Sequence, residues 1–225
     1  MRILFRPILA LAITTTLAAS SLAQTPAPVD LRILAINDFH GYLRPPTGGI
    51  TIADPEDKTK KITVAAGGAE HMATLVGQLR EVRKNTIFVA AGDLIGASPF
   101  LSAMFHDEPT VEALSMMGLN ISAVGNHEFD EGKDELLRMQ HGGCHPVDQC
   151  QGPHPFFAGA KFRYLAASTI VKDTGKTVFP AYEIRSFDGI PVAFIGLTLK
   201  GTPGLVSPVG IADLEFREKP VRSMR

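Results

Sequence analysis

Three short apolar segments, each ending abruptly in a polar loop, constrain the fold of this 225-residue chain more than any other feature. Continuous apolar runs bounded by turn residues are typical of strands buried on both faces. We therefore predict three buried strands that each deliver a polar loop. The apolar segments are residues 31–36, 86–91 and 120–124, and the loops begin Asn37-Asp38-Phe39-His40-Gly41, Gly92-Asp93 and Gly125-Asn126-His127-Glu128.

Helical patterns separate these strands. Between the first two, an apolar stripe at helical spacing predicts a helix from Ala69 whose stripe lies in the core. Between the second and third, Pro109 predicts a helix start and Gly118 its end. The alternation of strands and helices is typical of parallel βαβ units. The stripe consists of Met72, Leu75, Val76, Leu79 and Val82.

The remaining segments predict antiparallel and irregular structure. Residues 44–68 favour a surface hairpin, and residues 164–171 a strand. Residues 182–197 predict a second hairpin, with a type I′ turn at Asp188-Gly189. The fold class is therefore mixed α/β.

The ends of the chain are expected to differ from its globular part. Residues 1–23 are typical of a secretory signal, with Arg2 and Arg6 before an apolar stretch, although an uncleaved membrane anchor is the alternative. Residues 24–30 are expected to be a lead-in, 31–215 the folded domain and 216–225 a frayed tail. Cleavage after Ala23 would make the protein secreted or periplasmic.

The charge balance limits the partners. The chain has 22 Lys and Arg against 23 Asp and Glu, and loss of residues 1–23 would make it more acidic. Such a domain is a poor ligand for nucleic-acid polymers. After residue 23 no apolar run approaches the roughly 20 residues that span a bilayer, so no membrane partner is expected.

Two cysteines lie close together in a segment rich in Gly, Pro and His. In an oxidising compartment, Cys144 and Cys150 are most simply a disulfide that closes a small surface loop. The alternative is a metal site that includes His141, His145 and His154, but their spacing is irregular for structural zinc. His106, beside two acidic residues, is expected at the surface.

The polar loops are expected to meet, because the carboxyl ends of adjacent parallel strands share one edge of a sheet. Two divalent cations roughly 3.5–4 Å apart need a bridging carboxylate and mixed oxygen and imidazole ligands. Asp93 suits the bridge, Asp38 and His40 suit one metal, and the amide oxygen of Asn126 suits the other. His127 is then left to face a substrate. Asp130, three residues on, could hydrogen-bond the His127 imidazole.

These motifs resemble those of the calcineurin-like metallophosphoesterases. The resemblance rests on Asn37 to Gly41, on Ala91-Gly92-Asp93 with Ser98, and on residues 123–130, AVGNHEFD. More narrowly, the chain is similar to the secreted bacterial 5′-nucleotidases, a family that includes UDP-sugar hydrolases and 2′,3′-cyclic-nucleotide phosphodiesterases. The similarity runs from about residue 31 to residue 214.

The resemblance implies the amino-terminal half of a layered α/β/β/α sandwich. It implies two divalent metal ions of the Mn, Zn or Mg class and a nucleotide or sugar-nucleotide substrate, attacked by a metal-activated water. The metal ligands would be Asp38, His40, Asp93 and Asn126, and the catalytic pair would be His127 with Asp130.

The sequence departs from the family pattern in its histidines. The family site is completed by histidines after the next strand and in a Gly-His-x-His-type loop, whereas the last histidine here is His154. The sequence also lacks the family's carboxyl-terminal nucleotide-binding domain. With four candidate ligands, the metal beside Asn126 would keep only Asp93 and one amide oxygen. We therefore expect weak or no phosphatase activity from this polypeptide alone.

Other functions fit the sequence less well. The main alternative is an inactive secreted fragment or binding module that holds at most one metal. An aspartyl-phosphate mechanism at Asp38 generally needs a second carboxylate two positions later, where His40 stands. Ser98 lacks a Gly-x-Ser-x-Gly elbow, and the glycines form no dinucleotide-binding motif.

Overall fold

The computed structural model describes residues 27–151 and 156–219, so the expected signal at residues 1–23 lies outside the described residues. No described helix is both long and apolar enough to cross a bilayer. The strands are β1 (Arg32–Ile36), β2 (Ile50–Ala53), β3 (Lys61–Val64), β4 (Thr86–Ala90), β5 (Ile121–Ala123), β6 (Arg163–Leu165), β7 (Thr169–Val171), β8 (Tyr182–Phe187), β9 (Ile190–Ile195) and β10 (Leu214–Phe216). The helices are α1 (Gly68–Glu81), α2 (Phe100–Ala103), α3 (Glu108–Met116) and α4 (Lys133–His141), with 3-10 turns η1 (His127–Phe129), η2 (Thr202–Gly204) and η3 (Val209–Ile211).

A parallel sheet organises the molecule. Its strand order is β1-β4-β5-β6, and each neighbouring pair is parallel, which confirms the predicted βαβ arrangement. The β1–β4 ladder pairs all five residues of each strand. The β4–β5 ladder is much shorter and pairs only Val89 with Ile121 and Ala90 with Ser122.

The two faces of this sheet are covered by different layers. Alternate side chains of β4 point to opposite faces. Phe88 and Ala90 join a core that also contains Val111 and Leu114 of α3 and Leu136 of α4.

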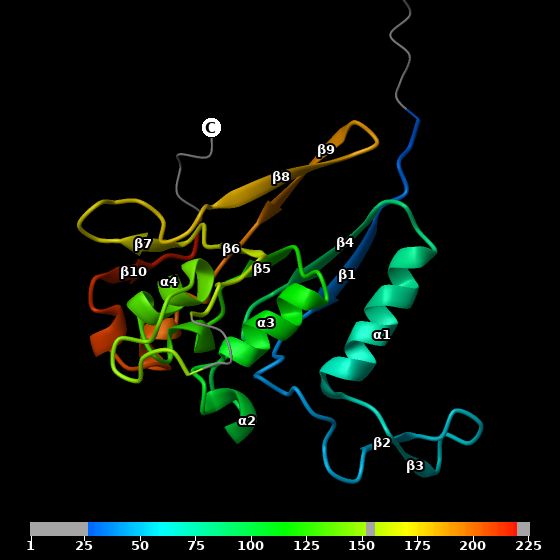
Figure 1. Cartoon of the computed structure of the whole chain (residues 1–225). Coiled ribbons are helices and arrows are strands. Elements are labelled where there is room, and N and C mark those ends of the chain that lie inside the picture. Colours follow the sequence, from blue (N-terminus) through cyan, green and yellow to red (C-terminus); the bar gives the residue numbers. More distant parts are fainter. Residues whose placement is uncertain (1–26, 152–155, 220–225) are drawn as a thin grey trace, which may run out of the picture.

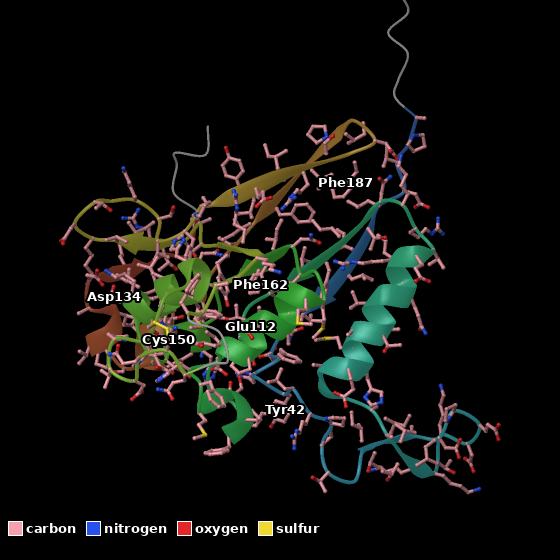
Figure 2. The ribbon with its side chains drawn as sticks, viewed as in Figure 1. Tyr42, Glu112, Asp134, Cys150, Phe162 and Phe187 are labelled. Carbon is pink, nitrogen blue, oxygen red and sulfur yellow. A yellow bond between two sulfur atoms is a disulfide. The ribbon has the colours of Figure 1, made fainter. Side chains whose placement is uncertain are left out.

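The opposite face packs against the β8–β9 hairpin (Figure 1). Ile87, Ile121 and Leu165 meet Phe187 and Phe194 of the hairpin there, and Phe187 is labelled in Figure 2. The described chain thus contains a helix layer, a parallel sheet and a hairpin layer. These correspond to three layers of the sandwich that the resemblance implies.

The apolar stripe of α1 is less buried than the sequence predicts. Val76 is the only buried residue of this helix, whereas Leu75 and Val82 are 55% and 67% exposed. The helix packs beside β1 and β4, and β1 is an edge strand of the sheet (Figure 1). A helix over a sheet edge has little to pack against along part of its apolar side. The prediction that the stripe lies in the core therefore holds for Val76 and Met72 but is wrong for Leu75 and Val82.

The strand predicted at residues 164–171 is divided into two. β6 belongs to the parallel sheet, whereas β7 pairs with β10 in a separate antiparallel sheet. Between them, the Ala166 N–H donates to the Pro180 carbonyl and the Ala167 N–H to the Gly196 carbonyl. The chain changes sheets because these intervening groups bond to loops rather than to a neighbouring strand.

Both predicted hairpins are present. β2 pairs with β3, and β8 pairs with β9 through Asp188 and Gly189, which both have positive φ as a type I′ turn requires. The tail begins later than expected, since Phe216 ends β10 and packs edge-on against the Phe129 ring. Pairing with β7 keeps this residue in the fold, which the polar sequence after it does not reveal.

Candidate metal and phosphoryl-transfer site

The three polar loops meet at one edge of the parallel sheet, as the sequence predicts. They follow β1, β4 and β5, which are neighbours in the sheet. Backbone hydrogen bonds join the first two loops: the Asp38 N–H donates to the Gly92 carbonyl at 3.2 Å, and the His40 N–H donates to the Asp93 carbonyl at 3.1 Å. The loop positions are therefore set by backbone pairing as well as by strand order.

Three of the four candidate metal ligands adopt left-handed backbone conformations. Asp38, His40 and Asp93 have φ values of 52°, 44° and 52°. This region is uncommon for residues other than glycine, although Asp and His are enriched in it. Such strain is found at sites where the surrounding structure holds it for a functional reason.

Asp38, His40 and Asp93 form a compact group whose ligand atoms lie within 4.8 Å of one another. His40 Nδ1 donates to the Gly96 carbonyl at 2.8 Å, which leaves Nε2 free as a ligand atom. That Nε2 lies 3.8 Å from Asp38 Oδ1. Two carboxylates and one imidazole, with one ring nitrogen already fixed by a carbonyl, are a suitable donor set for a divalent metal ion.

Two glycines allow the second and third loops to touch. A Cβ on Gly92 would lie 2.4 Å from the Gly125 backbone nitrogen, and a Cβ on Gly125 would lie 2.2 Å from Asp93 Oδ1. Neither position has room for a side chain. Asn126 follows directly and precedes the turn η1, so its amide is carried on the loop that touches Asp93.

His127 and Asp130 form a hydrogen-bonded pair beside this group. His127 Nδ1 donates to Asp130 Oδ2 at 2.8 Å. The ring of His127 meets the ring of His40 edge to face, with 4.8 Å between centroids. Burial lowers the pKa of His127, but the bond to Asp130 and the nearby carboxylates outweigh it, so the pKa is raised. The pairing proposed from their spacing is thus present as a contact.

Glu128 is a site residue to which the sequence assigns no role. It is 2% exposed, and its carboxylate accepts hydrogen bonds from the backbone N–H groups of Asp93, Leu94 and Gly125. Burial raises its pKa to about 7, against the opposing effect of these bonds. The available signal was a carboxylate inside the Gly125–Phe129 motif, but spacing cannot show that it points inward.

A second cluster lies near the site and also escaped the sequence analysis. His106 is not a surface residue, because its side chain is only 17% exposed. Its Nδ1 donates to Glu131 at 2.8 Å and its Nε2 donates to Asp148 at 2.8 Å. Its ring stacks on that of His145, with centroids 3.7 Å apart and planes 10° from parallel. One small pocket is lined by His106 and Glu131 together with His127 and Asp130.

This cluster is a hydrogen-bonded network rather than a metal site. His106, His145, Glu131 and Glu135 do place ligand atoms within 4.8 Å of one another. The lone pair of an imidazole nitrogen lies in the plane of its ring, so two rings in a near-parallel stack cannot both direct lone pairs at one ion. Both nitrogens of His106 also already donate to carboxylates.

The loop of the second cluster is closed by a bond between Cys144 and Cys150, shown in yellow in Figure 2. His145 Nδ1 accepts the backbone N–H of Asp148 at 3.1 Å. His141, at the end of α4, lines a different cleft with Lys161 and Arg163, and His154 lies outside the described residues. The alternative metal site built on the cysteines and these histidines therefore has no support.

Comparison with known proteins shows the family of the chain. The family model described as calcineurin-like phosphoesterase matches residues 31–199. An uncharacterised protein of the pqq-V 5′ region of Acinetobacter calcoaceticus is 43% identical over 164 residues, covering 71% of this chain and 80% of that protein. The endonuclease YhcR of Bacillus subtilis is 37% identical over 196 residues, covering 85% of this chain but 15% of that protein.

The NAD 5′-nucleotidase of Haemophilus influenzae is 27% identical over 203 residues, covering 88% of this chain and 30% of that protein. The solved structure of the NAD nucleotidase from that organism has a TM-score of 0.65 and 26% identity, covering 84% of this chain and 30% of that one. A 5′-nucleotidase precursor from Thermus thermophilus has a TM-score of 0.60 at 23% identity over 84% of this chain and 32% of that one, which shows a shared fold. Apart from the Acinetobacter protein, the chain therefore spans less than a third of each of these relatives.

Proposed function

Because the chain belongs to the calcineurin-like phosphoesterase family, we propose that it hydrolyses phosphoester bonds of nucleotides in the manner of a 5′-nucleotidase. The observation that carries this proposal is the meeting of Asp38, His40 and Asp93 beside the His127–Asp130 pair. A structural role does not require two carboxylates and two imidazoles to meet in loops with left-handed backbone conformations. A site for phosphoryl transfer requires such groups, to hold metal ions and to donate a proton.

The donor set fits divalent metal ions. Asp38, His40 and Asp93 would hold one ion, and Asp93 with the amide of Asn126 would hold a second less firmly. When bound, such ions supply Lewis-acid activation of water and of phosphoryl oxygens. Because Asp93 and Asn126 are the ligands proposed for the second ion among the described residues, we expect weak turnover from this polypeptide.

His127 is the proposed catalytic acid. Asp130 fixes Nδ1 and so orients the ring, which leaves Nε2 to donate a proton or a hydrogen bond to the phosphoryl group or the leaving oxygen. Asp130 acts through His127 and positions it.

The substrate class and the compartment are also proposals. Two relatives are named for nucleotide hydrolysis, which supports a nucleotide or sugar-nucleotide substrate. The 37% identity to an endonuclease makes phosphodiesters the second candidate. The disulfide-bonded loop, together with the signal-like residues 1–23, supports secretion or a periplasmic location.

The proposal is tested by hydrolysis of AMP and of a chromogenic phosphodiester by the purified chain with added Mn²⁺ or Zn²⁺. The rate should fall roughly 10²–10⁴-fold in His127→Ala, the usual contribution of a general acid. His71→Ala is the matched control, because His71 is exposed on α1 and its Nδ1 contacts only the Gly67 carbonyl. Its rate should equal that of the unchanged chain.

The outcome decides between the two readings of the chain. Turnover that depends on His127 and Asp93 supports the enzyme. A folded chain that hydrolyses neither substrate and binds at most one Mn²⁺ would instead support the alternative, a binding module. The ratio of the two hydrolysis rates separates monoester from diester specificity.

A further inference from the structure

We propose that Glu128 is the positioning residue of this site, because its buried carboxylate ties the loop that carries Asp93 to the loop that carries Asn126. This inference deepens the proposed function and concerns how the site is held together. Glu128 touches neither substrate nor reacting atoms in this role. It acts through the backbone of its neighbours.

The sheet itself does not fix the spacing of these two loops. The β4–β5 ladder ends at the pair Ala90 and Ser122, before either loop begins. Beyond that point the strands no longer supply hydrogen bonds that would set the distance between the loops. Another group must therefore hold the two loops at a fixed distance, so that Asp93 and Asn126 stay close together.

The carboxylate of Glu128 supplies the hydrogen bonds that hold the two loops together. Its Oε2 accepts the Asp93 N–H at 2.9 Å and the Gly125 N–H at 2.6 Å, while Oε1 accepts the Leu94 N–H at 2.8 Å. Two of these donors belong to the loop after β4 and one to the loop after β5. One rigid group therefore bridges both loops.

The backbone of the first loop is shaped to bind such an anion. Gly92 and Asp93 have successive positive φ values of 102° and 52°, and the consecutive N–H groups of Asp93 and Leu94 both point at Glu128. Consecutive N–H groups that converge in this way form an anion-binding concavity. Within the described residues, no Lys, Arg or His forms a salt bridge with Glu128, so these amides are its partners.

A reciprocal contact holds the side chain of Asp93. The N–H of His127, the residue before Glu128, donates to Asp93 Oδ1 at 2.9 Å. The turn η1 thus holds Asp93 twice, by its backbone through Glu128 and by its carboxylate through His127. The rotamer of the proposed bridging ligand is set by the same turn that carries the catalytic histidine.

Substitution of Glu128 by glutamine tests this inference in the full chain. The amide has one oxygen, and its NH₂ group would face at least one of the three N–H donors. We expect the hydrogen-exchange rates of the backbone amides of Asp93, Leu94 and Gly125 to rise at least about tenfold in the metal-free variant. This rise is counted after correction for any change in the global free energy of unfolding. We also expect Mn²⁺ affinity, measured by electron paramagnetic resonance, to fall by at least about tenfold.

Glu135→Gln is the matched control. Glu135 is also a little-exposed carboxylate, with its side chain 10% exposed, but its hydrogen bonds within the described residues go to Arg138 and not to the backbone of either loop. This variant should have a lower free energy of unfolding. After correction for that loss, the exchange rates of the three amides should be unchanged, and so should the Mn²⁺ affinity.

Either of two results would overturn the role of Glu128. One is unchanged exchange at the three amides in Glu128→Gln after correction for stability, and the other is an equal effect in Glu135→Gln. The exchange measurement uses neither substrate nor metal. A chain that shows the Glu128 effect but hydrolyses nothing would therefore contradict the proposed function and not this inference.

Discussion

Backbone conformation at single residues explains why this site needs the residue types that it has. Asp38, His40 and Asp93 combine a ligand side chain with a left-handed backbone, which glycine would adopt more easily but could not use for binding. Gly125 has the opposite requirement. It must have no side chain, because Asp93 occupies the space where a Cβ would lie.

Gly125→Ala is expected to destabilise the chain and weaken metal binding. The new Cβ would lie 2.2 Å from Asp93 Oδ1 and 2.6 Å from the Asp93 nitrogen. Neither atom can move freely, since Oδ1 accepts the His127 N–H and the nitrogen donates to Glu128. We expect a loss of about 1–3 kcal/mol in the free energy of unfolding, measured by urea denaturation.

Gly77→Ala supplies the comparison for that measurement. Gly77 lies within α1, and a Cβ there would meet nothing within 4 Å. Alanine should stabilise the helix by up to about 1 kcal/mol and leave Mn²⁺ affinity unchanged. If both glycine variants behaved alike, close contact between the loops would not be the reason for Gly125.

Among the elements, the disulfide-closed loop is tied to the site region by the hydrogen bonds of His106, whereas the disulfide only closes the loop on itself. His106, between α2 and α3, bridges Glu131 before α4 and Asp148 in the loop. Because both ring nitrogens donate to carboxylates, the bridge needs the protonated imidazole. Burial lowers the pKa of His106, but the bonds to Glu131 and Asp148 outweigh it and raise the pKa.

The loop should therefore loosen as pH rises. A raised folded-state pKa means that the stabilisation is fully present below the ordinary value of 6.5 and is lost as pH rises through the folded-state pKa. The groups that face His106 are Glu131, Asp148, the more distant Glu135 and the stacked ring of His145. We expect hydrogen exchange of residues 144–150, corrected for intrinsic rates, to show extra opening at pH ~8 relative to pH ~6.

His106→Gln should remove this extra pH dependence, because glutamine cannot become protonated in this range. The carboxylates and the disulfide would remain. If the variant kept the same pH response, another group in the loop would be the cause.

At the scale of the whole molecule, binding of a metal ion at the candidate site would be coupled to folding through the parallel sheet. The candidate ligands come from loops after three different strands, and they are brought together only when β1, β4 and β5 are paired. An ion that binds this arrangement therefore stabilises the folded chain over the unfolded one.

Saturating Mn²⁺ should raise the melting temperature, and a chelator should reverse the rise. At about 100 times the dissociation constant, the stabilisation is about 2.7 kcal/mol, or roughly 5–10 °C for a chain of this size. Asp93→Ala should abolish the shift, whereas Asp173→Ala, an exposed carboxylate in a turn, should keep it. An equal shift in both variants would show that the ion binds elsewhere.

Local patterns were enough to predict much of this architecture. The strands that end at Ile36, Ala90 and Ala123 follow from apolar runs and turn residues, and the turn at Asp188-Gly189 follows from the local preference for positive φ. Nonlocal pairing was harder to predict. Residues 164–171 have the composition of one strand, yet bonds to Pro180 and Gly196 divide them between two sheets.

The sequence by itself determined which side chains are delivered to the carboxyl edge of the sheet, because strand ends and loop residues are neighbours along the chain. Only the tertiary structure decided how these side chains are held. Glu128 turns inward to three amides, and His106 pairs with Glu131 and Asp148, 25 and 42 residues away. Such contacts depend on the distance between loops that fold together, and that distance is not encoded in the spacing of residues along one segment.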